Sequence, residues 1–225
     1  MYLVVRKDVP LGRGQAMGLA GAGAVRCADA LATAPAWADA FGAWAPRPRK
    51  VALRASEEEL TALAGALDGI VVDDVLLCLP PRRRSASEAE LAALRPYTDP
   101  PRGPAPPAAA DGPLPLLRYV VPAGVLRTTG KAMAQAGHAA LECAQELGAS
   151  APEAFSAWRA VGCPGEVRSA ADADWSRVRA HALDGAGVVV SDAGLTQVAP
   201  GTETVAAFPP SAQPPPQLQG LDVVP

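Results

Sequence analysis

The chain repeats itself at a fixed offset, and this repeat limits the possible fold more than any other feature. Residues 14–31 align without gaps to residues 130–147, and nine of the 18 aligned positions are identical. The same offset of 116 residues places Ala66–Gly69 on Ala182–Gly185. Agreement in two separate segments indicates a tandem duplication, so both halves are expected to share one fold.

The predicted elements follow the same order in each half. A short apolar strand (Tyr2–Val5; Tyr119–Val121) precedes an Ala-rich helix, a Trp-containing helical stretch and a second short strand (Val51–Arg54; near Val167). A further helix leads to a continuous apolar run, which predicts a central strand covered on both faces (Ile70–Val72; Val188–Val190). Strands that alternate with helices predict a layered α/β fold.

Pro-rich sequence separates the two copies. The predicted limits are residues 1–98 for the first domain, 99–116 for a linker and 117–225 for the second domain. The closing run, Leu218–Val224, is expected to add an edge strand.

Composition excludes several classes of protein. No run reaches the roughly 18 apolar residues of a membrane span, and the N-terminus lacks the order of a signal peptide. The four cysteines form no CxxC pair, so we expect them to be reduced and the protein to be cytoplasmic (Cys27, Cys78, Cys143, Cys163). With only two histidines, a His-rich metal site is not expected.

The repeated helix carries a polar stripe in the second copy only. Lys131, Gln135 and His138 stand at i, i+4 and i+7, so they share one face of a helix otherwise built from small residues. The Gly130-Lys131 pair is no Walker A loop, because Ala132 follows the lysine. Lys131 falls in the first turn, where an anion is favoured. Alternatively it is a solvated surface lysine, and the other two are satisfied polar residues.

A loop about fifty residues later supplies the matching groups. Asp192 follows an apolar strand, a usual site position in open α/β sheets, although it could merely hold the next turn through an Asx bond. The Pro200-Gly201 turn is expected to aim nearby groups at one place, namely the hydroxyls of Thr196, Thr202 and Thr204.

The first copy lacks these groups. It has Gln15, Leu19 and Ala22 in place of the polar stripe, and its loop is cut to residues 73–80. We therefore expect it to be chemically inactive.

These motifs resemble those of the archaeal and eukaryotic (second) class of peptidyl-tRNA hydrolases, over about residues 118–209. The GK-xxx-Q-xx-HA helix reads Gly130-Lys131, Gln135 and His138-Ala139, and the DAG-x-T-x-x-x-PGT-x-T loop runs from Asp192 to Thr204. The resemblance implies a three-layer α/β/α domain with a mixed, roughly four-stranded sheet in each copy, and a reaction that uses neither metal nor another cofactor.

The resemblance also implies roles for single residues. The catalytic set would be Lys131, Asp192, Thr196 and Thr204, and substrate would be bound by Gln135, His138, Gly201 and Thr202. The substrate would be peptidyl-tRNA, whose ester to the ribose is hydrolysed. Because members of the family generally dimerise, the duplication would be a pseudo-dimer within one chain.

The distribution of charge predicts different roles for the two copies. From residue 112 onward there are 7 Lys and Arg against 10 Asp and Glu, a net charge of −3, whereas the first part is neutral with 13 of each. Because phosphate contacts dominate affinity for nucleic acids, an acidic catalytic half predicts weak tRNA binding on its own. We hypothesise that the Arg-rich runs of the first copy bind the RNA (Arg47–Lys50; Arg82–Arg84). The alternatives are a binding module without turnover and a hydrolase of another acyl ester or amide.

Overall fold

The computed structural model describes residues 1–45, 48–82, 89–98, 113–194 and 198–225. One sheet contains β1 (Tyr2–Arg6), β2 (Val51–Ala55), β3 (Ile70–Val72), β4 (Leu76–Leu79) and β5 (Arg95–Pro96). The other contains β6 (Leu116–Pro122), β7 (Gly165–Ala170), β8 (Val188–Ser191), β9 (Glu203–Ser211) and β10 (Asp222–Val223).

The two sheets repeat one topology. Their strand orders are β3-β4-β1-β2-β5 and β8-β9-β6-β7-β10, so each strand has a counterpart in the other sheet. β1 and β6 pair in parallel with β2 and β7, and the other pairings are antiparallel. The α/β class with mixed sheets is confirmed, and the common topology supports an internal duplication.

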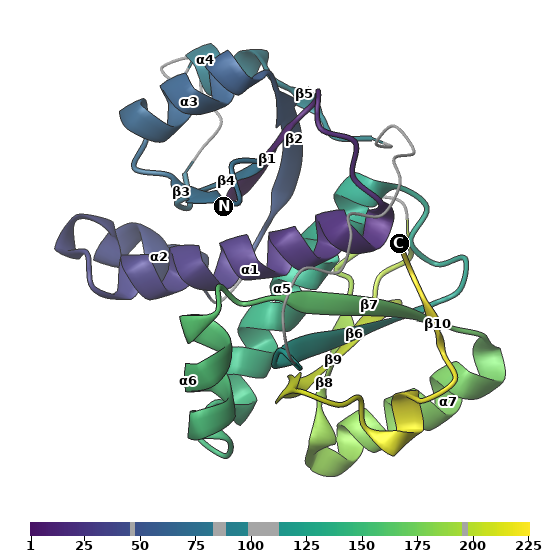
Figure 1. Cartoon of the computed structure of the whole chain (residues 1–225). Coiled ribbons are helices and arrows are strands. Elements are labelled where there is room, and N and C mark those ends of the chain that lie inside the picture. The colour runs from purple at the N-terminus through teal and green to yellow at the C-terminus, as the bar shows by residue number, and fades with distance from the viewer. Residues whose placement is uncertain (46–47, 83–88, 99–112, 195–197) are drawn as a thin grey trace.

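Helices cover both faces of each sheet and form a shared middle layer. α1 (Arg13–Ala32) and α5 (Thr129–Leu147) pack against each other between the sheets (Figure 1). On the outer faces lie α3 (Glu57–Ala66) with α4 (Ala89–Ala93), and α7 (Asp172–His181). The shorter elements are η1 (Pro35–Trp37), α2 (Ala38–Trp44), α6 (Pro152–Ala160), η2 (Ala182–Ala186) and η3 (Pro216–Leu218). One apolar cluster spans both sheets and the two middle helices, so the copies share a core.

Small residues let α1 and α5 approach closely, and they do so reciprocally. A Cβ placed on Gly21 would lie 3.4 Å from the Cβ of Ala140, and one on Gly137 would lie 3.4 Å from the Cβ of Ala24. These residues are equivalent in the repeat, since both pairs differ by 116. The contact therefore has the isologous form of a two-fold dimer interface, built within one chain.

The ends of these helices are also matched across the copies. A Cβ on Gly14 would overlap the carbonyl oxygen of Val224, and a Cβ on Gly130 would overlap that of Tyr97. Each glycine thus stands where backbone from the edge-strand segment of the opposite copy passes over the start of the helix. This contact accounts for glycine at both repeat positions.

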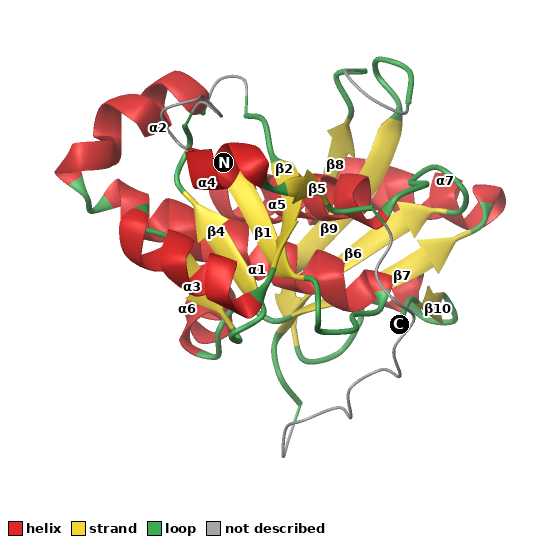
Figure 2. Cartoon of the chain, turned by 90° about the horizontal axis from the view of Figure 1, so that it is seen from above, coloured by secondary structure: helices red, strands yellow, loops and turns green. Residues whose placement is uncertain are grey.

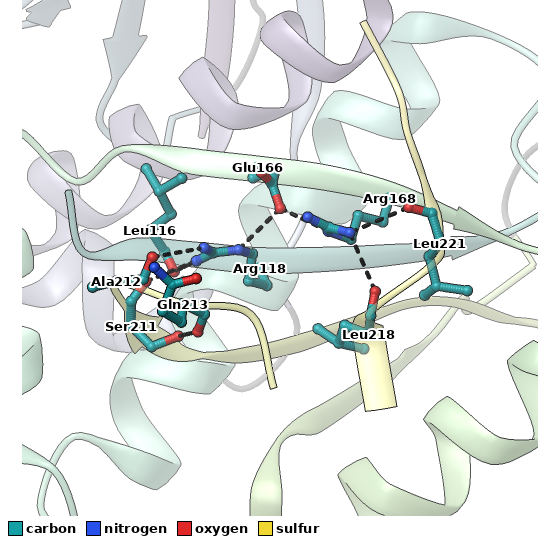
Figure 3. A network of polar contacts seen from close by, with 9 residues as sticks. All are labelled: Leu116, Arg118, Glu166, Arg168, Ser211, Ala212, Gln213, Leu218 and Leu221. Carbon is teal, nitrogen blue, oxygen red and sulfur yellow. Dashed lines mark hydrogen bonds and ion pairs between the residues drawn. The ribbon is translucent and has the colours of Figure 1, made fainter. Parts of the chain in front are cut away.

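A polar network holds the C-terminal segment on the second sheet (Figure 3). Arg118, only 2% exposed, donates to Glu166 at 3.0 Å and to the carbonyl oxygen of Ser211 at 2.9 Å. Arg168 donates to the same carboxylate at 2.7 Å and, at 3.2 Å each, to the carbonyl oxygens of Leu218 and Leu221. The shared carboxylate offsets the cost of burying the Arg118 charge.

The strand predictions need two corrections. Ile70–Val72 and Val188–Val190 form β3 and β8 at sheet edges, so the prediction of central strands was wrong. The chain turns back after each of these strands, and β4 and β9 pair between them and the rest of the sheet. The sequence had predicted loops for β4 and for the start of β9. Each sheet also has five strands rather than about four, because a two-residue strand joins its edge; β10 is the one expected within Leu218–Val224.

No helix within the described residues is long and apolar enough to cross a lipid bilayer.

The close packing of α1 against β6 and α5 can be tested with paired glycine substitutions. Gly21→Ala should destabilise the protein by about 2 kcal/mol, because the new methyl group would overlap the hydroxyl of the fully buried Tyr119. Gly42→Ala is the control, since no atom lies within 4 Å of its Cβ position in α2, and it should be neutral or stabilising by up to about 1 kcal/mol. Chemical denaturation measures both; equal stabilities of the two variants would contradict this packing.

Candidate active site

α5 and the two strands β8 and β9 bring four polar side chains into one chain of contacts. Lys131 Nζ forms an ion pair with Asp192 Oδ2, and Gln135 Nε2 donates to the same oxygen at 2.5 Å. The Thr204 hydroxyl donates to Gln135 Oε1 at 2.9 Å. Of the predicted catalytic set, Lys131, Asp192 and Thr204 are thus brought together. Gln135, assigned to substrate binding, links Asp192 to Thr204.

The start of α5 places Lys131 at the edge of the core. The Thr128 side chain caps the helix by accepting from the Lys131 N–H at 3.4 Å. Residues 132–137 are all buried, whereas Lys131 and His138 are partly exposed. The small residues of the helix therefore anchor it between the sheets, and its polar stripe reaches the surface at two points.

The backbone of the β8–β9 loop positions Asp192. Its N–H donates to the Thr202 carbonyl oxygen at 2.8 Å, and its own carbonyl oxygen accepts from Gly201 N–H at 2.8 Å. Gly194 N–H donates to Asp192 Oδ1 at 2.7 Å, which is the bond expected of an Asx turn. The Asx bond that the sequence left open is therefore present, and the same carboxylate also pairs with Lys131.

Glycines and a proline give the loop its path. Gly194 has φ +74°, and a Cβ there would overlap Pro200. Gly201 has φ +80°, which L side chains rarely adopt. The Thr202 hydroxyl donates to the Ala199 carbonyl oxygen at 2.7 Å, so Gly201 and Thr202 build the turn. Thr196 lies outside the described residues.

The network is buried and electrostatically paired. Asp192 and Gln135 are each 5% exposed and Thr204 is 0% exposed, whereas the Lys131 side chain is 11% exposed. The carboxylate accepts from an ammonium, an amide and a backbone N–H, and a carboxylate has room for about one further donor. This arrangement holds a cation next to an acceptor that can orient one water molecule.

His138 lies apart from this network and contacts the first copy. Its Nδ1 is 3.0 Å from Nζ of Lys50, which is 8% exposed. Burial, together with the nearby ammonium groups of Lys50 and Lys131, lowers the pKa of His138 to about 3. The imidazole is therefore neutral at physiological pH. The sequence does not predict this partner, because Lys50 belongs to the basic run Arg47–Lys50, for which RNA contacts are the expectation.

Most of the positive charge of the second copy is engaged in ion pairs. Of the seven Lys and Arg residues from 112 onward, six form ion pairs (Arg118, Lys131, Arg159, Arg168, Arg177, Arg179). Arg82 of the first copy stacks on Trp37 and donates to the Leu67 carbonyl oxygen at 2.8 Å. Within the described residues, no group of three or more His, Cys, Asp or Glu is placed to hold a metal ion.

Comparison with known proteins identifies the part of the chain that carries this site. Among curated protein sequences, none matches the chain. The family model described as peptidyl-tRNA hydrolase PTH2 matches residues 118–215, a range that includes Lys131, Gln135, Asp192 and Thr204. A domain of the peptidyl-tRNA hydrolase PTH2 family therefore lies at residues 118–215, in the second copy.

Proposed function

We propose that the second copy hydrolyses the ester that joins a peptide or an N-blocked amino acid to tRNA. The observation that carries this proposal is the contact chain Lys131–Asp192–Gln135–Thr204, which lies within the PTH2 domain. In this chain of contacts an ammonium and a carboxylate with room for a further donor lie side by side at the edge of the core. We propose a cytoplasmic role in translation, with residues 1–98 and 117–225 as the two domains and 99–116 as their linker.

The geometry suggests how the ester would be cleaved. Asp192, already the acceptor of three donors, would orient a water molecule towards the ester carbonyl carbon rather than act as a strong base. Lys131 would stabilise the negative charge that develops on the carbonyl oxygen as the new C–O bond forms. Collapse of this intermediate breaks the bond to the ribose oxygen, which leaves with the proton lost by the water.

Gln135 and Thr204 would act through Asp192 and not on the substrate. The Gln135 amide donates to Asp192 and accepts from Thr204, whose single hydroxyl proton is shared with the more distant Val190 carbonyl oxygen, 3.2 Å from Thr204 Oγ1. We therefore propose a positioning role for both residues. Thr196, if it completes the catalytic set, would do so from the loop outside the described residues.

A binding module without turnover is the second candidate, and one observation favours it. Six of the seven cations of the second copy are engaged in ion pairs, which leaves this copy little charge for phosphate contacts. Under the enzyme proposal, the first copy would supply contacts to the RNA through its arginines.

Removal of the Lys131 ammonium tests the catalytic proposal. Lys131→Ala should lower kcat/KM for release of an N-blocked amino acid from tRNA by about 10²–10³-fold, because the charge opposite the developing oxyanion is lost. Lys7→Ala, which removes an exposed lysine of the first copy, should keep full activity. Single-turnover release of labelled amino acid measures both. Equal rates for the two variants would exclude Lys131 from catalysis.

The positioning role of Thr204 can be separated from its packing. Thr204→Val keeps the shape of the side chain but leaves the Gln135 amide oxygen without this donor. It should lower the free energy of unfolding by about 1–3 kcal/mol and kcat by up to about 10²-fold. Thr204→Ser keeps the hydroxyl and should retain most of the activity. Denaturation curves and kcat are compared; a Val variant with the serine variant's kcat would disprove the role.

A small substrate distinguishes the enzyme from the binding module. If the chain is a hydrolase with weak RNA contacts, it should cleave both N-blocked aminoacyl-tRNA and an N-blocked amino acid alkyl ester. The tRNA reaction alone should slow as salt is raised, because only that substrate needs phosphate contacts. Cleavage of neither substrate by the folded chain would favour the binding module.

A further inference from the structure

A lysine of the first copy reaches the active-site helix of the second. Lys50 directly precedes β2, and its side chain crosses Gly137 of α5, where an added Cβ would lie 2.9 Å from its Cδ. Its Nζ ends 3.0 Å from His138 Nδ1 and 4.9 Å from the centroid of the Trp44 ring. The glycine thus makes room for a lysine stem that runs through the interface between the copies.

The surroundings of this pair determine its charge. Burial lowers the pKa of Lys50 to about 7, opposed by Cys78 and by Glu142, the next carboxylate along α5. The imidazole is flanked by Lys50, by Lys131 and by the amino group of Met1, all of which disfavour its protonation. Lys50 therefore takes up a proton more readily than His138, and below pH 7 the pair consists of an ammonium and a neutral ring.

An ammonium group can only donate hydrogen bonds, and this determines which ring nitrogen of His138 carries the proton. A neutral imidazole carries one proton, on either Nδ1 or Nε2, and the partner of one nitrogen decides the choice. Because Lys50 donates at Nδ1, that nitrogen must be the acceptor. The proton is then on Nε2.

We propose that Lys50 of the first copy fixes the tautomer of His138, so that Nε2–H is a hydrogen-bond donor on the same α5 face as Lys131 and Gln135. Lys50 is thereby a positioning residue supplied across the pseudo-dimer interface. The partner of this Nε2–H would be an acceptor oxygen of the substrate, and this part of the proposal rests on the proposed function. The assignment of the tautomer does not depend on that function.

The equivalent residues cannot form this contact in the reverse direction, from the second copy to the α1 helix of the first. The repeat offset of 116 places Ala22 at the position of His138 and Glu166 at the position of Lys50. Glu166 instead joins Arg118 and Arg168 in the network of the second sheet (Figure 3). The asymmetry means that the first copy, though it lacks the catalytic groups, serves the site of the second.

The tautomer can be observed directly, because His138 and His181 are the only histidines. In the full chain labelled with ¹⁵N in its imidazole rings, correlation spectra at pH 6 distinguish a protonated ring nitrogen from an acceptor, and His181→Gln assigns the signals. The wild type should show His138 with a bare, hydrogen-bonded Nδ1. In Lys50→Met this bond is lost and the Nδ1–H form becomes populated, whereas Lys50→Arg should preserve the wild-type pattern.

Two results would overturn the proposal. One is an unchanged His138 spectrum in Lys50→Met; the other, which needs no variant to fold, is a wild-type ring protonated at Nδ1. Lys7→Met controls for loss of a lysine elsewhere in the first copy. If the wild type hydrolyses aminoacyl-tRNA, Lys50→Met should raise KM about threefold to tenfold and leave kcat unchanged, as for loss of one substrate hydrogen bond. A wild type without hydrolysis would contradict the proposed function but leave the spectra to decide the tautomer.

Discussion

The close approach of α1 and α5 is the contact on which the structure depends. A helix that presents Gly and Ala can lie near another helix and near a sheet at the same time, and here both do (Figure 1). The reciprocal pairs, Gly21 with Ala140 and Gly137 with Ala24, join the two copies as a dimer interface would. One apolar cluster runs through this middle layer and joins the copies, while a smaller cluster lies within each copy on the outer face of its sheet. The first copy is therefore part of the core that holds α5.

The same layer determines what the active-site helix can expose. α5 packs between two sheets and against α1, so within residues 129–141 of the helix only Lys131 and His138 are partly exposed. The second copy contributes the charged end of that stripe and the carboxylate opposite it. The first copy contributes backbone from Tyr97 against Gly130, the Arg13 guanidinium bound to the Leu126 carbonyl oxygen at 3.0 Å, and Lys50 against His138. In Figure 2, α2 and the β8–β9 loop extend from one edge of the molecule, so both copies contribute to that edge.

Charge is used here mainly to hold the fold together. Arg118, Arg168 and Glu166 fasten the C-terminal segment, and Arg159 crosses between the copies to Asp29 at 2.8 Å. Such pairs neutralise cations that an RNA-binding surface would otherwise offer to phosphates. The proposed hydrolase therefore differs from a strongly basic RNA-binding protein. Its affinity for tRNA is the property that experiments should measure first.

The duplication, the α/β class, the residues of the polar stripe and the loop that faces it can all be predicted from the sequence, because repeats, periodicity and motif spacing are local properties. The sequence could not place β3 and β8, since an apolar run suits an edge strand covered by helices as well as a central one. Nor could it show that Gln135 joins Asp192 to Thr204, or that Lys50 crosses to His138. Those contacts join residues 57, 69 and 88 positions apart, and only the packing of the two copies around α1 and α5 brings them within hydrogen-bond distance.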